Sequence, residues 1–417
     1  MEIRRDSITG SDSSILTGRT IILALCGSVA ILRSIDIARA LMRHGATVVP
    51  VMSASATRLV GPDLVHWATG VPPITGLTGA NEHVALAGNE GTPADLLLVA
   101  PATANTVGKI VHGIDDTPVT TVAATALGQG LPILLAPAMH EPMYTNPAIQ
   151  RNLETARSLG IGVVESKVVE GKAKMADVQH IVDASIRAIR SRTSAFAGRT
   201  VLVTAGRTVE YLDPVRVVTN NSSGKMGVAL ARAAYHEGAN VTLVYGKGTA
   251  VPPEGVRVVQ VETAEQMLRE VLECLSQDRP LVDVMIAAAA VGDWKARHPA
   301  AKKTATHGVE ELQVDLLPTP KIIDEVRRQN PNLRLVAFRA QHDLEHSELM
   351  RDGRARMERA GADMIAINDV SKPGRGFESE TNEMTLLFPD GTEVLVPMAD
   401  KYAVARRILD VIATRIL

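Results

Sequence analysis

The amino-acid sequence predicts an α/β protein built from two doubly wound, Rossmann-like domains. At 417 residues the chain is longer than one hydrophobic core normally accommodates, so two domains are expected. The order strand, turn of small residues, helix, strand occurs in residues 20–52 and again in residues 200–245. This order predicts a parallel sheet, in which ligands bind at the carboxyl ends of the strands.

The first half opens with one such strand–helix–strand unit. Thr20–Leu25 is an apolar run typical of a buried strand, and Thr47–Met52 is a second one. Between them, apolar residues at helical spacing predict a helix over Ile31–His44, which Gly45 ends. The dipeptide Gly27-Ser28 precedes this helix. It is either a phosphate-binding loop or a plain tight turn, and the local sequence favours neither.

Two later strands of the first half end in similar residues. Ala94–Ala100 runs into Pro-Ala-Thr-Ala-Asn-Thr, and Pro132–Ala136 runs into Pro-Ala-Met-His. Asn105, in the first of these segments, can donate and accept hydrogen bonds and can therefore hold an amide or a carboxylate. His83 falls in a predicted loop before the third strand. A lone histidine in such a place is more often a surface residue than a catalytic one.

The second half repeats the pattern with a different turn. Thr200–Ala205 predicts a strand, and Met226–Glu237 predicts a helix. Before the helix, Thr219–Gly227 reads Thr-Asn-Asn-Ser-Ser-Gly-Lys-Met-Gly. Small residues, a lysine and the free N–H groups of a helix start suit a phosphate. The segment is neither a Walker A loop nor a GxGxxG motif, and an ordinary N-cap by Ser222 or Ser223 explains it as well.

The remaining elements fit a Rossmann-like sheet that ends in a hairpin and a helix. Met384–Phe388 and Glu393–Val396 flank a Pro-Asp-Gly turn, and Asp400–Leu417 is a closing amphipathic helix. Other strands are predicted at Val241–Tyr245, Val256–Val261, Leu281–Ala289, Leu333–Phe338 and Asp363–Ile367, with a helix at Ala264–Leu275.

Polar stretches suggest the domain boundaries. Residues 1–18 are polar and predict a flexible tail. A helix over Ile181–Ile189 ends the first domain, residues 19–190. Residues 191–198, Ser-Arg-Thr-Ser-Ala-Phe-Ala-Gly, are small and mostly polar and predict a linker, which leaves residues 199–417 for the second domain.

Composition limits the classes of partner. Apolar residues make up 46% of the chain and charged residues 22%, as in ordinary globular proteins, and the net charge is −2. This balance gives no reason to expect nucleic acid or a membrane surface as a partner. The chain has two cysteines, Cys26 and Cys274, in different halves. A disulfide framework is therefore not expected, and the cytoplasm is the predicted location.

Several motifs, taken in order, resemble a known family. Residues 101–106 (PATANT) and 137–140 (PAMH), with Gly27–Ala30 and His83, resemble the flavin-dependent cysteine decarboxylases. The second half resembles phosphopantothenate–cysteine ligase, with Ala-Gly-Arg-Thr at 205–208, Asp-Pro-Val-Arg at 213–216, the segment Asn220–Gly227 and Asn-Asp-Val-Ser at 368–371. From about Arg19 to its end, the chain resembles the bifunctional phosphopantothenoylcysteine decarboxylase/phosphopantothenate–cysteine ligase family of coenzyme A biosynthesis.

The resemblance implies that the first domain is a flavodoxin-like, FMN-binding domain. It implies decarboxylation of phosphopantothenoylcysteine to 4′-phosphopantetheine after flavin has oxidised the cysteinyl thiol. His83 takes the place of the family's catalytic histidine and Asn105 that of its carboxylate-binding asparagine. The positions that correspond to flavin-binding residues are Gly27, Ser28, Val29, Ser53, Ala104, Asn105, Thr106, Val107 and Met139.

One departure from the bacterial pattern concerns the proton donor. The bacterial family has a Cys-Gly-Asp lid that protonates the enethiolate, whereas residues 168–175 here read Val-Val-Glu-Gly-Lys-Ala-Lys-Met. Together with Pro-Ala-Met-His, this segment resembles the archaeal version. His140, Lys172 and Lys174 are candidate donors, and a solvated lid over the substrate phosphate is the alternative for the two lysines. The lost cysteine also leaves open a first domain that only binds flavin and assembles the enzyme, beside an active ligase.

For the second domain the resemblance implies a nucleotide-binding ligase. CTP would activate the carboxylate of 4′-phosphopantothenate as an acyl-cytidylate, which the amine of L-cysteine attacks, with Mg²⁺ or Mn²⁺ as the metal. Asn220 and Lys302 are the implied catalytic residues, and Lys303 is an alternative to Lys302 because the alignment needs a gap there. The implied nucleotide- and substrate-binding residues are Gly206, Arg216, Asn220, Ser222, Ser223, Gly224, Lys225, Ala287, Ala288, Ala289, Asp293, Lys302, Pro320, Lys321, Ile322, Ile323, Phe338, Arg356 and Arg359.

The resemblance also implies assembly. Flavin domains of this kind form trimers and ligase domains form dimers. Together they imply a closed homo-oligomer, most simply a dodecamer.

Overall fold

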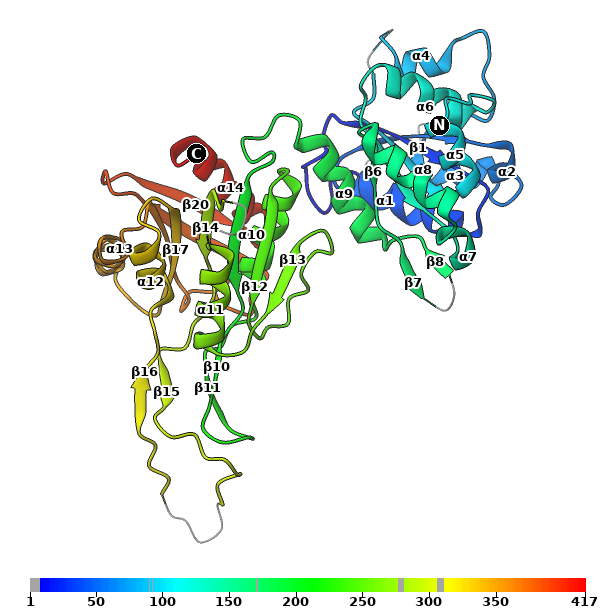
Figure 1. The fold of residues 1–417 in the computed structure, drawn as a ribbon. Helices are drawn as coiled ribbons and strands as arrows, with labels where there is room; N and C mark the ends of the chain where they lie inside the picture. Colours follow the sequence, from blue (N-terminus) through cyan, green and yellow to red (C-terminus); the bar gives the residue numbers. More distant parts are fainter. Residues whose placement is uncertain (1–7, 90, 92, 170–171, 277–280, 306–310) are drawn as a thin grey trace. The chain divides into compact units, whose positions relative to one another are not determined.

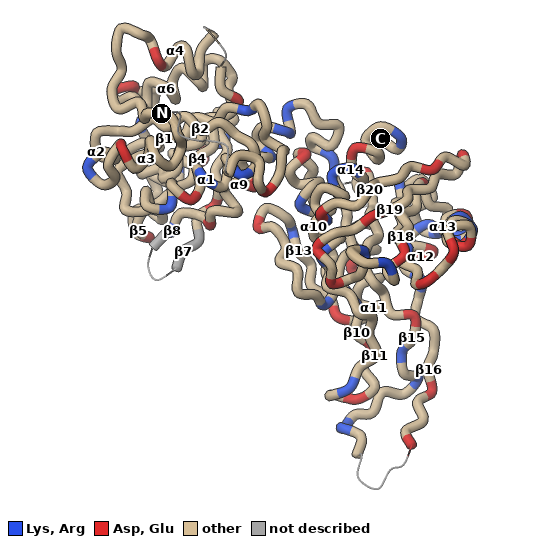
Figure 2. Tube along the Cα trace, turned by 180° about the vertical axis from the view of Figure 1, so that it is seen from behind, with Lys and Arg blue, Asp and Glu red and all other residues tan. Residues whose placement is uncertain are grey.

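The structure is a computed structural model that describes residues 8–89, 91, 93–169, 172–276, 281–305 and 311–417. The chain divides into two compact units between Arg192 and Thr193. Both units are α/β, as predicted, and Figure 1 shows helices on the faces of each sheet. Lys and Arg are interspersed with Asp and Glu along both units (Figure 2).

The first unit is built on a five-stranded parallel sheet in the order β2-β1-β3-β4-β6. Helices α5, α6 and α8 cover one face, where their apolar side chains meet those of β1, β3 and β4. Helices α1 and α9 pack against each other and against the sheet. The strands are β1 (Thr20–Leu25), β2 (Thr47–Met52), β3 (Leu96–Ala102), β4 (Ile133–Pro137) and β6 (Gly162–Val163). The helices are η2 (Val29–Arg33), α1 (Ser34–Arg43), α2 (Ala54–Thr57), α3 (Pro62–Thr69), α4 (Glu82–Ala87), α5 (Ala104–Val111), α6 (Pro118–Gly128), α7 (Glu141–Tyr144), α8 (Pro147–Ser158) and α9 (Val178–Arg190).

Three short strands form a separate antiparallel sheet in this unit. They are β5 (Met139–His140), β7 (Lys167–Val169) and β8 (Lys172–Lys174), in the order β5-β8-β7. The sheet lies where the resemblance placed the lid.

The second unit contains an eight-stranded sheet in the order β13-β12-β9-β14-β17-β18-β19-β20. The strands from β13 to β18 are parallel, and β19 and β20 add an antiparallel hairpin, as predicted. One face of this sheet packs against α10 and α14, and the other against α11, α12 and α13. The strands are β9 (Thr200–Ala205), β12 (Asn240–Tyr245), β13 (Arg257–Gln260), β14 (Val284–Ala287), β17 (Arg334–Gln341), β18 (Met364–Asp369), β19 (Thr381–Leu387) and β20 (Glu393–Asp400). The helices are α10 (Lys225–His236), α11 (Ala264–Cys274), α12 (Ile322–Gln329), α13 (His346–Ala360) and α14 (Lys401–Arg415).

Two strand pairs of the second unit extend away from its sheet (Figure 1). They are β10 (Val209–Tyr211) with β11 (Val217–Thr219), and β15 (Trp294–Ala296) with β16 (Leu316–Pro318), both antiparallel. Neither pair was predicted from the sequence, because a three-residue strand is too short to show a periodic pattern.

The predicted domain edges need two corrections. Within the tail predicted for residues 1–18, Ile15 and Leu16 are buried, and the backbone N–H of Leu16 donates to the His44 carbonyl at 2.8 Å. Residues 8–18 therefore pack on the first unit, whereas residues 1–7 lie outside the described part of the chain. Phe196, in the predicted linker, is buried in the core that α10 and α14 share. The aromatic side chain of Phe196 within an otherwise small and polar stretch could have indicated that this part of the predicted linker is buried.

Candidate active sites

Four neighbouring strands of the first unit end in residues that the resemblance assigned to flavin. Gly27, Ser28 and Val29 follow β1, Ser53 follows β2, Ala104 to Val107 follow β3, and Met139 follows β4. All four strands run in parallel, so these segments share one edge of the sheet. The chain order reverses between β1 and β3, because β2 lies on the other side of β1. Such a reversal opens the crevice in which parallel α/β sheets bind ligands.

Helix starts supply N–H groups at this edge. Ser28, Ser53 and Thr103 cap η2, α2 and α5, and each side-chain oxygen accepts from a first-turn N–H at 3.2–3.3 Å. Close packing requires glycine at position 27, because a Cβ there would lie 2.4 Å from the Cβ of Ser55. The two interpretations of Gly27-Ser28 are compatible, since a capped turn at a sheet edge is also a place for an anion.

Asn105 and Cys26 lie at this edge of the sheet but differ in their accessibility to a ligand. Asn105 is exposed on the first turn of α5, and its amide has no hydrogen-bond partner among the described residues. Cys26 is fully buried, and burial raises the pKa of its thiol to about 11. It therefore stays protonated and inaccessible, so it is unsuited to replace the cysteine of the bacterial lid.

His83 lies on a helix, which corrects the predicted loop. It is the second residue of α4, and Nδ1 is buried without a hydrogen-bond partner among the described residues. The same part of the structure shows no hydrogen bond between His83 and Asn105.

The lid brings two of the candidate proton donors into register. His140 of β5 is paired with Lys172 of β8 in the antiparallel ladder, and Met139 is paired with Ala173. His140 and Lys174 are exposed. The side chain of Lys172 lies outside the described part of the structure.

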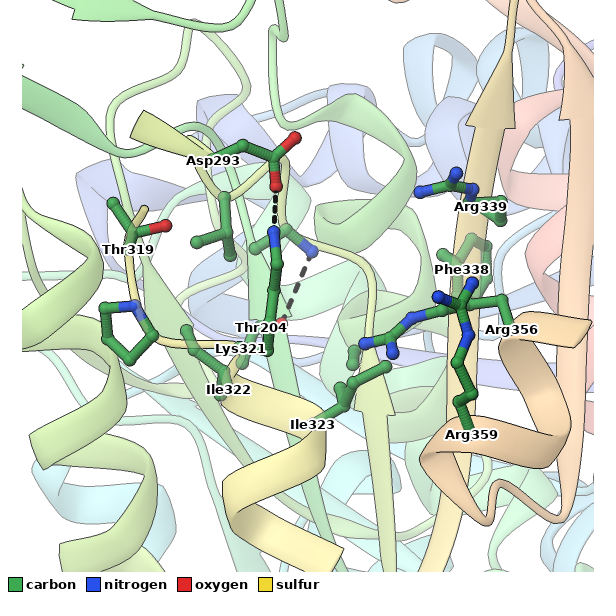
Figure 3. A pocket seen from close by; sticks show the side chains of 14 residues that line it. Thr204, Asp293, Thr319, Lys321, Ile322, Ile323, Phe338, Arg339, Arg356 and Arg359 are labelled. Carbon is green, nitrogen blue, oxygen red and sulfur yellow. Dashed lines mark hydrogen bonds and ion pairs between the residues drawn. The ribbon is translucent and has the colours of Figure 1, made fainter. Parts of the chain in front are cut away.

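In the second unit a cavity of about 310 Å³, the arginine pocket, opens beyond the ends of β9, β14 and β17. Arg339, Arg356 and Arg359 stand on one side of it, and Asp293 and Lys321 form an ion pair on the other (Figure 3). The pocket is lined by Thr204, Ala287, Ala289, Val291, Asp293, Thr319, Pro320, Lys321, Ile322, Ile323, Phe338, Arg339, Arg356 and Arg359. Ten of these residues are among those that the resemblance implied for the nucleotide.

The three arginines differ in how their charges are neutralised. Arg339 Nε lies 3.0 Å from Asp352, and the guanidinium of Arg356 lies 2.8 Å from Asp324. Arg359 donates to the Ala355 carbonyl and forms no ion pair within the described residues. A pocket wall of three guanidinium groups, one of which forms no ion pair within the described residues, suits an anionic ligand.

A second cavity of about 370 Å³, the lysine pocket, shares Ala289, Val291, Asp293, Phe338 and Arg339 with the arginine pocket. The start of α10 forms one wall, from Asn220 to Gly227. Gly224 caps this helix with φ +79°, and a Cβ there would lie 2.8 Å from the Tyr245 ring. Only glycine combines that conformation with that approach. The rest of the lining comprises Ala288, Ala290, Ala340, Asn368, Val370, Arg375, Gly376, Phe377, Asn382, Met384 and Lys401.

The Asn220 side chain is held so that its oxygen remains available. Nδ2 donates to the carbonyls of Ala290 and Val291 at 3.2 and 3.0 Å. Oδ1 has no donor among the described residues and can accept a hydrogen bond from a ligand in the lysine pocket.

Three predicted residues line neither pocket. Gly206 packs against the backbone of Lys247. Arg216 and Asp213 form an ion pair at 2.8 Å, and both hold the backbone of Thr304. Lys302 is exposed in the connection between β15 and β16, two residues before Thr304. Asp213 is buried, which raises the pKa of its carboxyl, but hydrogen bonds from the N–H groups of Val215, Arg216 and Thr304 lower that pKa well below its usual range overall.

Three basic residues of the pockets were not predicted from the sequence: Arg339, Arg375 and Lys401. Arg339 follows the predicted Phe338 directly, so its place on β17 could have been found. Arg375 lies in a loop with no regular pattern. Lys401 is the first residue of a helix, where an acidic residue is the usual preference. A lysine at a position that usually prefers an acidic residue was the sequence feature that could have indicated a functional role for Lys401.

The described residues contain neither a metal-binding cluster nor a membrane-spanning helix. No group of three or more His, Cys, Asp or Glu residues there can hold a metal ion. Asp293 is the one acidic residue in either pocket lining. Among the same residues, no helix has both the length and the apolar character needed to cross a membrane.

Comparisons with known proteins agree with the two units. Residues 9–190 match the family model described as Flavoprotein, and residues 196–416 match the DNA/pantothenate metabolism flavoprotein C-terminal domain. The coenzyme A biosynthesis bifunctional protein CoaBC of Thermococcus kodakarensis is 43% identical over 403 residues, 97% of each chain. The CoaBC protein of Methanocaldococcus jannaschii is 35% identical and covers 88% of this chain and 87% of its own. The solved structure of the FMN-dependent cysteine decarboxylase SpaF is 32% identical, with a TM-score of 0.37, and covers 42% of this chain and 98% of its own.

Fold and family models together define a two-domain enzyme, in which a flavoprotein domain precedes a second α/β domain with two adjoining cationic pockets. The chain belongs to the CoaBC family of bifunctional coenzyme A biosynthesis proteins. It combines phosphopantothenate–cysteine ligase and phosphopantothenoylcysteine decarboxylase activities. The resemblance drawn from the sequence motifs, including its archaeal character, is confirmed.

Proposed function

We propose that the second unit uses CTP to activate the carboxylate of 4′-phosphopantothenate. A carboxylate oxygen attacks the α-phosphorus, pyrophosphate leaves, and the amine of L-cysteine then displaces CMP from the acyl-cytidylate. The observation that carries this proposal is the convergence of separate predicted segments on two adjoining pockets. A reaction between a nucleotide and a carboxylate needs two ligand sites that meet.

The pocket linings suggest a role for each group. Arg359 and Arg356 would bind the nucleotide phosphates, and Asn220 Oδ1 would accept a hydrogen bond from the substrate. Mg²⁺ or Mn²⁺ would be held mainly by phosphate oxygens, with Asp293 as the protein carboxylate within reach. The structure's single acidic lining residue fits that arrangement. Lys302 would join from its exposed segment, and Lys303 remains the alternative.

For the first unit we propose FMN at the carboxyl edge of the sheet. When bound, FMN supplies a hydride acceptor for oxidation of the cysteinyl thiol, and the same hydride is returned after CO₂ is lost. The capped helix starts after β1, β2 and β3 would bind its phosphate, and Asn105 the substrate carboxylate. His83 would act on the thiol. His140, Lys172 and Lys174 remain the candidate proton donors, and the pairing of His140 with Lys172 supports a donor in this lid.

Assembly would complete the first site. We propose trimeric flavin domains, dimeric ligase domains and a closed oligomer, most simply a dodecamer, in the cytoplasm. Two exposed apolar side chains of the first unit, Val29 at 79% and Trp67 at 65%, support contact between copies. The buried Nδ1 of His83, which has no hydrogen-bond partner among the described residues, fits a histidine that serves a neighbouring copy.

The test is one reaction analysed by mass spectrometry. Purified protein is mixed with 4′-phosphopantothenate, L-cysteine and Mg²⁺, and either CTP or ATP. We expect 4′-phosphopantetheine and CMP in the CTP reaction, at a much higher rate than with ATP. Phosphopantothenoylcysteine as the end product would leave the first unit as a flavin-binding assembly module. No product with either nucleotide would contradict the proposed ligase chemistry.

A further inference from the structure

Lys401 is a buried ammonium group in the wall of the lysine pocket. The residue is 7% exposed, and Nζ donates to the carbonyls of Gly376 and Phe377 at 3.3 and 3.1 Å. Among the described residues no carboxylate oxygen lies within 4.0 Å of Nζ. A buried charge is costly unless an opposite charge compensates it, and two neutral carbonyls compensate it only in part.

The surroundings of Lys401 are positively charged. Lys225 is the first residue of α10, Lys401 is the first residue of α14, and the two helices pack against each other. Each helix start adds a partial positive charge, so both lysines stand where an anion is preferred. Arg375 and Arg339 complete the basic lining.

Two nearby carboxylates form ion pairs with basic residues other than Lys401. Glu380 forms an ion pair with Lys225, and Glu383 lies 2.8 Å from the guanidinium of Arg375. Glu378 is exposed. Burial first, and then the charge of Lys225, lower the pKa of Lys401 to about 8, although Glu380 and Glu378 act in the opposite direction.

The backbone of residues 376–380 fixes these cations in place. Ser223 Oγ donates to the Phe377 carbonyl at 2.6 Å, and Lys225 Nζ donates to the Glu378 carbonyl at 2.8 Å. The N–H of Lys401 donates to the Glu380 carbonyl at 3.0 Å. The positive groups are therefore organised before any ligand binds, which reduces the entropy lost on binding.

We propose that Lys401, together with Arg375, binds a phosphate group of one of the two ligase substrates in the lysine pocket. The proposal deepens the ligase function given above and rests on it. Two sources share this chemistry: the triphosphate of the nucleotide and the 4′-phosphate of phosphopantothenate. Both can reach the pocket, because it shares a wall with the arginine pocket.

The test compares the affinities of the full chain for three compounds by isothermal titration calorimetry. These are CTP with Mg²⁺, 4′-phosphopantothenate, and pantothenate, which lacks the phosphate. The variants are Lys401→Met, Lys401→Arg and the control Lys372→Met, which alters an exposed lysine on the adjoining loop outside both pocket linings. Lys401→Met should weaken one phosphate ligand roughly 10- to 100-fold, as expected for one charge-assisted hydrogen bond. Lys401→Arg keeps the charge and should recover most of that loss, and Lys372→Met should bind like the wild type.

The possible outcomes distinguish a site for the 4′-phosphate, a site for the nucleotide triphosphate, and no phosphate site at Lys401. Weaker binding of 4′-phosphopantothenate but not of pantothenate assigns the site to the 4′-phosphate, and weaker binding of CTP assigns it to the triphosphate. Unchanged binding of all compounds, or an equal loss for pantothenate, overturns the proposal. If Lys401→Met does not fold, Arg375→Gln is judged by the same comparison. A wild-type chain that binds neither CTP nor 4′-phosphopantothenate would instead contradict the proposed ligase function.

Discussion

Replacing Lys401 with methionine is expected to stabilise the unliganded second unit at pH 7. The pKa of this lysine falls from 10.5 to about 8 in the folded protein, mainly because of burial. A fall of that size corresponds to a penalty of about 3 kcal/mol for holding the charge. Methionine removes the penalty but also loses two hydrogen bonds to carbonyls, at about 1 kcal/mol each. The net gain should be about 1 kcal/mol.

Differential scanning calorimetry of the unliganded full chain measures this change. A gain of about 1 kcal/mol should raise the melting temperature of the second unit by about 2–4 °C. The gain should also depend on pH. Below pH 8 both folded and unfolded chains carry the proton, so the penalty is fully present in the wild type. Between pH 8 and 10.5 the folded wild-type protein releases the proton first, and its stability rises relative to the variant.

The advantage of the variant should therefore shrink as the pH rises towards 10. A Lys401→Met protein that melts below the wild type at pH 7 would refute the reasoning, because Lys401 would then be a structural tie for the backbone of residues 376–380. A pH-independent difference would refute it equally. A Lys401→Met variant that is more stable but binds phosphate more weakly would show that Lys401 serves ligand binding at the expense of stability.

Three further outcomes are expected. Asn220→Ala should lower ligase kcat/KM roughly 10- to 100-fold in a pyrophosphate-release assay, because it removes the acceptor held by the two backbone carbonyls; an unchanged value would exclude this residue from the site. His83→Ala should retain the flavin absorbance but lose CO₂ release, whereas normal CO₂ release would favour a first unit without a catalytic role for this residue. Asp213→Asn should destabilise the second unit by about 1–3 kcal/mol in urea denaturation and speed proteolysis between residues 296 and 305, since the buried carboxylate accepts the N–H groups of Val215, Arg216 and Thr304. Equal proteolysis rates would show that Asp213 does not hold the segment of Lys302.

Regular elements of the fold were predictable because their patterns are local. The strand Thr200–Ala205 was predicted with its observed bounds, and the helix over Met226–Glu237 was displaced by one residue. The strand pairs β10–β11 and β15–β16 were missed, because three-residue strands carry no periodic signal. The loop predicted around His83 is a helix of six residues, too short for a sequence pattern to establish.

Local patterns did not identify the residues of the candidate ligase site. Residues such as Asp293 and Phe338 were found through their resemblance to family motifs, and the structure brings them together in two pockets. Lys401 and Arg375 were missed because their importance comes from tertiary contacts between segments distant in sequence. Their placement depends on the connection that precedes β19, whose Phe377 and Glu378 carbonyls accept hydrogen bonds from Ser223 and Lys225 at the start of α10. No local pattern encodes that approach.

The shared wall of the two pockets gives a physical reason for their separate cations. If the nucleotide occupies the arginine pocket and phosphopantothenate the lysine pocket, carboxylate and α-phosphate must meet near Phe338 and Arg339, which line both. Two anions approaching one another repel, and the repulsion is strong in a partly buried site. Arg339, which lines both pockets, lowers that repulsion, while Arg359 lines only the arginine pocket and Lys401 only the lysine pocket, so each can hold its ligand by a group that does not react. Binding energy gained at Lys401 or Arg359 can then position the reacting atoms without stabilising the unreacted carboxylate itself.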